Sequence, residues 1–155
     1  MRSLKKNEQS FGKKRLKVFV DANTIVSGLL FERNEALLLK LGALGACSLV
    51  TTRYVLDEVA RALRAEDFRL GDEEVAWLLS HANKCMVVYG NVTRKELHEY
   101  LSKLDDKKDA HVWAASDKLN CDILVTGDRE LLRKATRAKT TRETLEILLG
   151  KVEYL

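Results

Sequence analysis

Short apolar runs alternate along the chain with stretches in which apolar residues recur at helical spacing. Four runs are predicted to be strands: Leu16–Val20, Cys47–Thr51, Cys85–Tyr89 and Asp122–Thr126. They are apolar on both faces, which is typical of a parallel sheet that helices cover on both sides. A weaker run at Lys134–Lys139 predicts a short edge strand.

The segments between these strands have the periodicity of helix faces. The predicted helices are Ala22–Leu30, Asn34–Leu41, Arg53–Ala65, Gly71–His81, Thr93–Leu104, Ala110–Leu119 and Thr141–Leu149. Strands that alternate with helices predict one α/β domain, which we place at residues 16–155. Residues 1–15 are polar and basic and have no period, so we expect them to form a flexible N-terminal arm.

The composition is that of a globular protein, since 46% of the 155 residues are apolar and 32% are charged. No stretch approaches the roughly 20 apolar residues of a membrane span, and the basic N-terminus lacks the apolar core of a secretory signal. We therefore expect a cytoplasmic protein with no membrane partner. The cysteines, Cys47, Cys85 and Cys121, have no close metal-ligand spacing and are predicted to be buried structural thiols.

The net charge of +4 lies mainly in the N-terminal arm. The first 15 residues contain six basic side chains and one acid, which is +5, so the rest of the chain carries −1. A second basic segment, residues 129–142, has six Lys or Arg against Glu130 alone. This basic strip is either a solvated face or a surface for backbone phosphates, with Arg129, Arg133 and Lys134 as the predicted nucleic-acid-binding residues.

Two of the predicted strands run directly into an aspartate. Asp21 follows Val-Phe-Val, and Asp128 follows Val-Thr-Gly with a charged helix start behind it. Because ligands of open α/β sheets bind beyond the carboxyl ends of the strands, near a switch in strand order, we expect these two carboxylates to face each other. Asp128 is also a reasonable helix N-cap, and that alternative stays open.

Two more acids are predicted to point inward from helices. In the helix that begins near Arg53, Asp57 falls opposite the apolar face, whereas Glu58 falls on its edge, as a ligand or as one arm of a salt bridge. Asp109 shares a stripe with Val112 and Trp113 at a helix start, where it is a ligand or an N-cap.

If the four acids meet, their charges repel one another unless a cation neutralises them. Oxygen ligands without clustered His or Cys favour a hard cation, Mg²⁺ or Mn²⁺. The histidines, His81, His98 and His111, are scattered, and we expect surface or structural roles for them. No aromatic-rich platform for bases is visible in the sequence.

The segments "VDANTIVSGLL", "LDEVARAL", "DAHVWAAS" and "CDILVTGDRELL", in this order and spacing, resemble the PIN-domain nucleases over about residues 16–150. The resemblance implies a three-layer α/β/α fold with a central parallel sheet. It also implies an acidic pocket for one or two divalent metal ions. The four acids of the family match Asp21, Glu58, Asp109 and Asp128, which are thus the expected catalytic and metal-binding residues. Asn23 and Thr126 match the supporting polar positions, and Glu130 stands where many relatives have an aspartate.

The activity that this resemblance implies is cleavage of single-stranded RNA. Small single-domain relatives are often the toxin of a toxin–antitoxin pair, which implies an antitoxin protein as a partner, and PIN domains commonly form homodimers. The apolar helical faces around Leu37–Leu41 and Trp77–Leu79 are either a dimer surface or plain core.

Two alternatives to a nuclease remain. A PIN-like RNA-binding module without turnover is disfavoured because all four acids are intact. A phosphatase or receiver-type domain with Asp21 as the reactive carboxylate is disfavoured by Asn23, since haloacid-dehalogenase-like phosphatases need an acid at that position.

Overall fold

The computed structural model describes residues 15–65 and 67–150. Apart from Arg15, the predicted N-terminal arm lies outside the described residues. Five strands form one parallel sheet: β1 (Lys17–Val20), β2 (Ser48–Thr52), β3 (Val87–Tyr89), β4 (Ile123–Val125) and β5 (Ala138–Lys139). The described helices are α2 (Ala22–Leu30), α3 (Asn34–Ala43), α4 (Arg53–Leu63), α5 (Asp72–Cys85), α6 (Arg94–Leu101), α7 (Lys107–Lys118), α8 (Arg129–Lys134) and α9 (Thr141–Leu148).

The strand order is β3-β2-β1-β4-β5, so β1 lies in the middle of the sheet. The chain builds outward from β1 to β2 and β3, and then returns to the other side of β1 to add β4 and β5. The switch in strand order therefore lies between β1 and β4, where Val20 pairs with Val125. In a parallel sheet this is where a crevice opens at the carboxyl ends of the strands.

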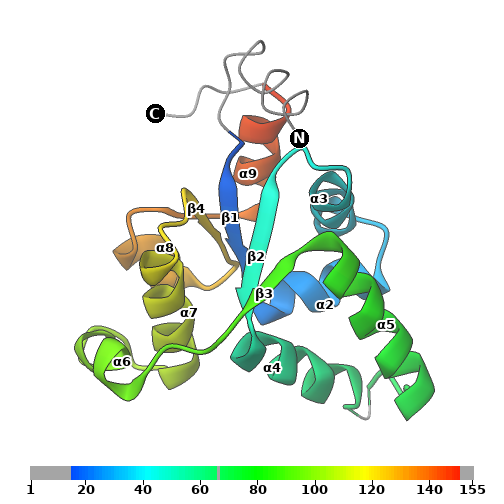
Figure 1. Cartoon of the computed structure of the whole chain (residues 1–155), viewed down its shortest axis with the longest axis horizontal. Coiled ribbons are helices and arrows are strands. Elements are labelled where there is room, and N and C mark those ends of the chain that lie inside the picture. Colours follow the sequence, from blue (N-terminus) through cyan, green and yellow to red (C-terminus); the bar gives the residue numbers. More distant parts are fainter. Residues whose placement is uncertain (1–14, 66, 151–155) are drawn as a thin grey trace, which may run out of the picture.

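Helices cover both faces of the sheet, which gives the three-layer α/β/α arrangement predicted from the sequence. Helices α6 and α7 lie on one side of the central strands, and α2, α3 and α5 lie on the other (Figure 1). The centre of the core is β1 and β4, whose residues Val18–Val20 and Ile123–Val125 are at most 1% exposed. Each such aliphatic side chain contributes about 1.5–3 kcal/mol by leaving water, so the ends of these two strands are firmly held.

The structure differs from the predicted elements at several boundaries. Helix α6 ends at Leu101, three residues before the predicted end, and α8 is not among the predicted helices. Helix α5 continues to Cys85, so the predicted strand over Cys85–Tyr89 is reduced to the three residues of β3. Helix α7 begins at Lys107, three residues before the predicted start. Only Ala138–Lys139 of the predicted edge strand is extended, because Lys134 still belongs to α8.

The apolar helix faces contribute to the core only in part. Leu38, Leu39 and Leu78 are buried, whereas Trp77 is 71% exposed. The three cysteines are buried free thiols, as the sequence predicts. Within residues 15–65 and 67–150, no helix is long and apolar enough to cross a membrane.

Candidate active site

Asp21 is fixed at the end of β1 by two hydrogen bonds to its carboxylate. It is the N-cap of α2, and its Oδ1 accepts a hydrogen bond from the backbone N–H of Thr24 at 2.9 Å. Its Oδ2 accepts a hydrogen bond from the hydroxyl of Thr126, which lies just beyond β4, at 2.7 Å. The carboxylate is thus held across the switch point between β1 and β4.

Asp128 is tied to the same hydroxyl group. The Oγ of Thr126, a residue only 1% exposed, accepts a hydrogen bond from the backbone N–H of Asp128 at 3.0 Å. The Oδ2 of Asp128 accepts one from the backbone N–H of Leu131 at 2.8 Å, which confirms that Asp128 is the N-cap of α8. The role of a cap does not remove Asp128 from the site, because this residue also lines the cavity described below.

Glu58 points inward from α4, whereas its neighbour Asp57 is exposed, as the helix periodicity predicts. The Glu58 side chain is 13% exposed, and its Oε2 lies 3.8 Å from the Nζ of Lys108 on α7. Burial raises the pKa of the Glu58 carboxyl, and the Lys108 charge acts in the opposite direction. Glu58 is therefore both an arm of an ion pair and a wall of the cavity.

Asp109 lies in the first turn of α7 but is not its cap. The N-cap is Asp106, which accepts a hydrogen bond from the backbone N–H of Lys108 at 2.8 Å, so the cap alternative for Asp109 is wrong. Burial, and next the negative charge of Asp128, raise the pKa of Asp109 to about 7. Asp106 and Asp21 add smaller contributions in the same direction. The carboxylates are thus close enough to repel one another.

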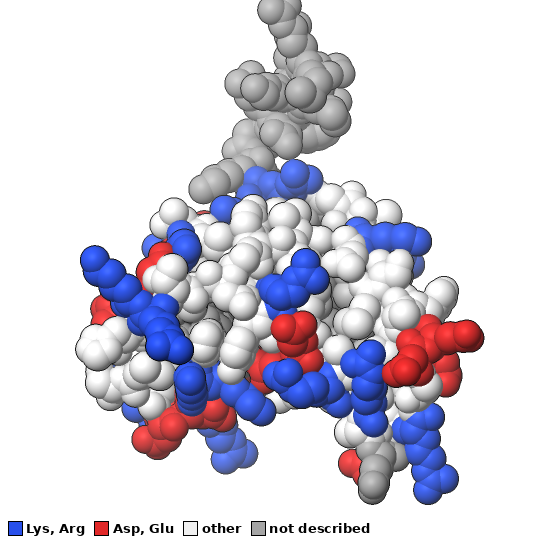
Figure 2. Space-filling model, turned by 60° about the horizontal axis from the view of Figure 1, so that its bottom comes forward, with Lys and Arg blue, Asp and Glu red and all other residues white. Residues whose placement is uncertain are grey.

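All four predicted acids line one open cavity of about 620 Å³, which we call the acid cavity. Its lining residues are Asp21, Ala22, Asn23, Glu58, Asp106, Lys108, Asp109, Val112, Gly127, Asp128 and Arg129. Figure 2 shows the lower face of the molecule, where acidic side chains in the middle have Lys and Arg side chains on either side. Thr126 donates its hydrogen bond to Asp21, a residue of the cavity wall, and Asn23 lines the cavity itself. These are the two residues that the family resemblance matches to supporting polar positions.

The carboxylates of the acid cavity suit a hydrated hard cation better than a dry metal cage. Among the described residues, no three His, Cys, Asp or Glu side chains are grouped closely enough to hold a metal ion directly. Mg²⁺ usually keeps several of its waters and binds proteins through one or two carboxylates. A wide cavity with acids on several walls fits that mode of binding. Burial is the largest cause of the raised pKa of Asp109, and the negative charges of Asp128, Asp106 and Asp21, which add to it, are the repulsion that a cation would relieve.

The basic strip does not form one surface around the acid cavity. Arg129 lines the cavity, and Arg133 is exposed on α8. Lys134 instead pairs with Glu130 at 3.0 Å and donates a hydrogen bond to the carbonyl of Lys103 at 2.8 Å. Its ammonium group therefore fastens α8 to the segment that follows α6.

Glu130 is a structural residue rather than part of the acid cavity. Its Oε1 accepts a hydrogen bond from the backbone N–H of Asp105 at 3.2 Å, and its Oε2 pairs with Lys134. The Lys134 charge-assisted hydrogen bond is the main reason why the pKa of Glu130 is lowered. The position where many relatives have an aspartate thus connects α8 to the loop before α7.

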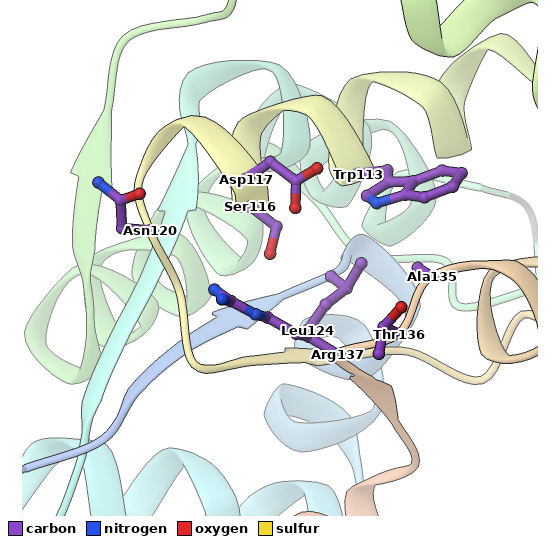
Figure 3. A pocket seen from close by; sticks show the side chains of 8 residues that line it. All are labelled: Trp113, Ser116, Asp117, Asn120, Leu124, Ala135, Thr136 and Arg137. Atoms are coloured by element: carbon purple, nitrogen blue, oxygen red, sulfur yellow. The ribbon is translucent and has the colours of Figure 1, made fainter.

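A second cavity of about 340 Å³ lies on the other side of α7, and we call it the α7–β5 cavity. It is lined by Trp113, Ser116, Asp117, Asn120, Leu124, Ala135, Thr136 and Arg137. Figure 3 shows the Arg137 side chain below Ser116, with α7 forming the opposite wall. Arg137 belongs to the basic strip but donates a hydrogen bond to the carbonyl of Cys121 at 2.9 Å, so it faces away from the acid cavity.

Two residues of the acid cavity are missed by the sequence prediction. Asp106 and Lys108 come just before Asp109, upstream of the predicted helix start at Ala110, and both line the acid cavity. The N-cap spacing of Asp106 is the one sequence signal that could have placed them at the start of a helix. His81 and His98 are exposed, as predicted.

The sequence pattern of the PIN domain family matches residues 17–130, which include all four acids. A comparison with functionally curated proteins gave no match. Three solved structures illustrate the fold. PAE2754 from Pyrobaculum aerophilum has a TM-score of 0.64 at 22% identity, over 87% of this chain and 96% of that chain.

The second structure is VapBC2 from Rickettsia felis bound to a DNA fragment from the promoter of VapBC2. One of its chains has a TM-score of 0.62 at 13% identity, over 81% of this chain and 98% of that chain. VapC20 from Mycobacterium tuberculosis, described as a sarcin-ricin loop cleaving toxin, has a TM-score of 0.55 at 17% identity, over 76% of this chain and 95% of that chain. At these identities the likeness establishes the fold alone. The family pattern, however, covers most of the chain, and this chain therefore belongs to the PIN domain family.

Proposed function

We propose that this protein is a divalent-metal-dependent endoribonuclease that hydrolyses phosphodiester bonds of single-stranded RNA. The observation that carries the proposal is that four carboxylates from separate segments converge on one cavity at the switch point of a PIN domain. Repulsion between these charges costs stability. A module that only binds RNA gains nothing from this arrangement, so the intact acids favour an enzyme.

We propose that Asp21, Glu58, Asp109 and Asp128 would hold Mg²⁺ or Mn²⁺, one or two of them directly and the others through water molecules of the ion. The ion would supply Lewis-acid activation of a water molecule and stabilisation of the charge that develops on the phosphoryl oxygens. Thr126 holds the Asp21 carboxylate and the backbone of Asp128 in register through one hydroxyl group. This arrangement keeps the two strand ends at a fixed separation without an added charge.

We expect two cations of the acid cavity, Lys108 and Arg129, to contact the RNA backbone, because both line the cavity that the phosphate would enter. Such contacts position the backbone without reading the bases. Lys108 has a second role, because its ion pair with Glu58 offsets part of the repulsion in the metal-free protein.

The comparison structures favour a toxin of a toxin–antitoxin pair as the biological setting. VapC20 is described as a toxin that cleaves the sarcin-ricin loop, and VapBC2 is described as a complex on promoter DNA. We propose by analogy that this chain cleaves a cellular RNA and that an antitoxin protein covers the acid cavity.

The test is to incubate the protein with end-labelled single-stranded RNA and, separately, with a phosphomonoester, each with Mg²⁺ or Mn²⁺ and with EDTA. We expect RNA cleavage that EDTA abolishes, and no release of phosphate from the monoester. Release of phosphate would instead indicate the phosphatase alternative. RNA binding without cleavage, under all metal conditions, would indicate a non-catalytic module and overturn the proposal.

A further inference from the structure

Two aromatic rings stack between α4 and α7 beside the acid cavity. The ring centroids of Tyr54 and His111 are 3.9 Å apart, and the two planes differ by 8°. The residues come from helices far apart in the sequence, so neither ring indicates a platform when the sequence is considered alone. The pair is therefore a stacked aromatic surface that the sequence, in which no aromatic-rich platform is visible, does not reveal.

The stack lies directly beside residues of the acid cavity. Tyr54 is one helical turn before Glu58 on α4, and His111 is one helical turn after Lys108 on α7. The same two helices are joined by the ion pair between Glu58 and Lys108, and both of these residues line the cavity. Burial, and next the charge of Glu58, raise the pKa of the Tyr54 hydroxyl, which agrees with this proximity.

The pair does not have the character of a core contact. Both rings are only half-buried, and within the described part of the chain the buried Nδ1 of His111 has no hydrogen-bond partner. The His111 ring is therefore held by stacking rather than by a hydrogen bond. The backbone N–H of Tyr54 donates to the Oδ1 of Asn91 at 2.7 Å, which fixes the start of α4 and with it the ring.

Basic residues are close in sequence to both rings of the stack. Arg53 immediately precedes Tyr54, and Lys107 and Lys108 precede His111 by one turn; all three are exposed. Aromatic rings interleaved with cations are the combination that proteins use to hold single-stranded nucleic acid, because bases stack on the rings while the cations contact phosphates. A platform that is already rigid also loses little conformational entropy when the RNA binds.

We propose that the Tyr54–His111 pair is a stacking platform for an unpaired nucleobase next to the phosphate that enters the acid cavity. This inference rests on the proposed function and adds to it a subsite that recognises the base. The base stacks on the ring surface that the two partners leave exposed. Since every base has a π face, the subsite orders the strand and discriminates bases only weakly.

The test measures binding without cleavage. Single-stranded RNA oligonucleotides with 2-aminopurine at successive positions are titrated with the full-length protein in EDTA, and fluorescence quenching reports stacking. We expect one position to be quenched by the wild-type protein but not by Tyr54→Leu. Loss of one base–aromatic contact is worth about 1–3 kcal/mol, which is a weakening of Kd by about 5- to 150-fold.

Three variants keep the test decisive. Tyr54→Phe keeps the ring, and we expect it to restore quenching and affinity. His111→Leu removes the other half of the stack and is expected to weaken binding in the same direction. The matched control is Trp77→Leu, because Trp77 also stacks on a histidine, His81, with ring centroids 6.4 Å apart, but on α5, a helix that contributes no residue to the acid cavity; it should leave Kd unchanged.

An RNA that lacks the quenched base allows a double-mutant cycle with Tyr54→Leu. Removal of the quenched base should weaken binding to the wild-type protein but not to Tyr54→Leu, since both changes delete the same contact. Turnover of Tyr54→Leu at saturating RNA should persist, so the loss appears in KM. Additive effects of the two changes, or equal losses in Trp77→Leu, would overturn the platform. Failure of the wild-type protein to bind and cleave RNA would instead overturn the proposed function.

Discussion

Helix α7 separates two cavities, and each contains an aspartate of that helix in a different electrostatic setting. Asp109 lies in the acid cavity with carboxylates around it, and its pKa is raised to about 7. Asp117 lines the α7–β5 cavity, is exposed, and accepts a 2.6 Å hydrogen bond from the Tyr100 hydroxyl. The cation of that cavity, Arg137, donates to the backbone carbonyl of Cys121.

The contrast shows that a cavity alone does not indicate chemistry. In the α7–β5 cavity, Asp117 and Arg137 already have hydrogen-bond partners in the fold, so a structural role explains both charged groups. In the acid cavity, like charges are held together by the strand ends and by the Thr126 hydroxyl, at a cost to stability. Like charges that the fold concentrates and only partly neutralises, here through the ion pair of Glu58 with Lys108, are what favours a functional site.

Neutralisation of one acid of the acid cavity should have the largest effect on activity. In Asp21→Asn, the side-chain oxygen can still accept the N-cap hydrogen bond from Thr24, so we expect the free energy of unfolding to change by less than about 1 kcal/mol. RNA cleavage should fall by about 100-fold or more, since removal of one electrostatic stabiliser commonly costs about 10²–10³ in rate. Asp128→Asn should behave in the same way. Single-turnover cleavage and urea unfolding measure the two quantities.

The matched control is Asp117→Asn in the α7–β5 cavity. It removes a negative charge from the same helix and weakens the hydrogen bond from Tyr100, but we expect cleavage to stay within about twofold of wild type, because surface changes away from the site have small effects. If Asp117→Asn reduced cleavage as much as Asp21→Asn did, the two cavities would not differ in function. Large loss of stability with retained cleavage in Asp21→Asn would show that Asp21 is only a cap.

Divalent metal should stabilise the protein through the acid cavity only. At a Mg²⁺ or Mn²⁺ concentration of about 100 Kd, linkage raises the free energy of unfolding by about 2.7 kcal/mol. For a chain of this size, that corresponds to an increase in Tm of about 5–10 °C. Differential scanning fluorimetry with and without EDTA should show the shift for wild type and for the exposed-acid control Asp57→Asn. An equal shift in Asp21→Asn would place the metal elsewhere.

The raised pKa of Asp109 predicts a pH dependence in the metal-free protein. The carboxyl binds its proton more tightly in the folded state, with a pKa of about 7 against an ordinary 3.8. Below both values the group costs nothing, and stability falls as the pH rises from about 4 to about 7. Asp109→Asn should therefore stabilise the EDTA-treated protein at pH 8 by about 1–2 kcal/mol after solvent screening, and by less at pH 5. The same gain in stability at both pH values would contradict a raised pKa of Asp109 in the folded state.

The strand ends and the helix faces are what made the acid cavity predictable from sequence. A short run apolar on both faces has to be an interior strand, so the carboxyl ends of β1 and β4 follow, and with them the positions of Asp21 and Asp128. Helical periodicity likewise separates inward Glu58 from outward Asp57. These inferences need only local patterns and the geometry of a parallel sheet.

The missed features depend on neighbours that are distant in the sequence. Asp106 and Asp109 have the same side chain and the same cap propensity, so the residue at which α7 begins decides that Asp106 is the cap and that Asp109 is not. The basic strip looks continuous in the sequence, but a short helix followed by β5 sends Arg129 and Arg137 to different cavities. The Tyr54–His111 stack joins two helices whose contact no local pattern reports.

The smallest expected effect concerns the basic N-terminal arm, which is predicted from the sequence and lies outside the described residues. Deletion of residues 2–14 removes five basic side chains and one acid and keeps Arg15, whose side chain donates a hydrogen bond to the carbonyl of Gly45 at 3.3 Å. If the arm contacts RNA phosphates, the plot of log K against log salt should become shallower by roughly 0.7 for each lost contact on a single strand. Turnover at saturating RNA should persist, because every proposed ligand remains. An unchanged salt slope would assign the phosphate contacts to Lys108 and Arg129 at the acid cavity, and a loss of turnover would show that residues 2–14 belong to the folded domain rather than to an arm.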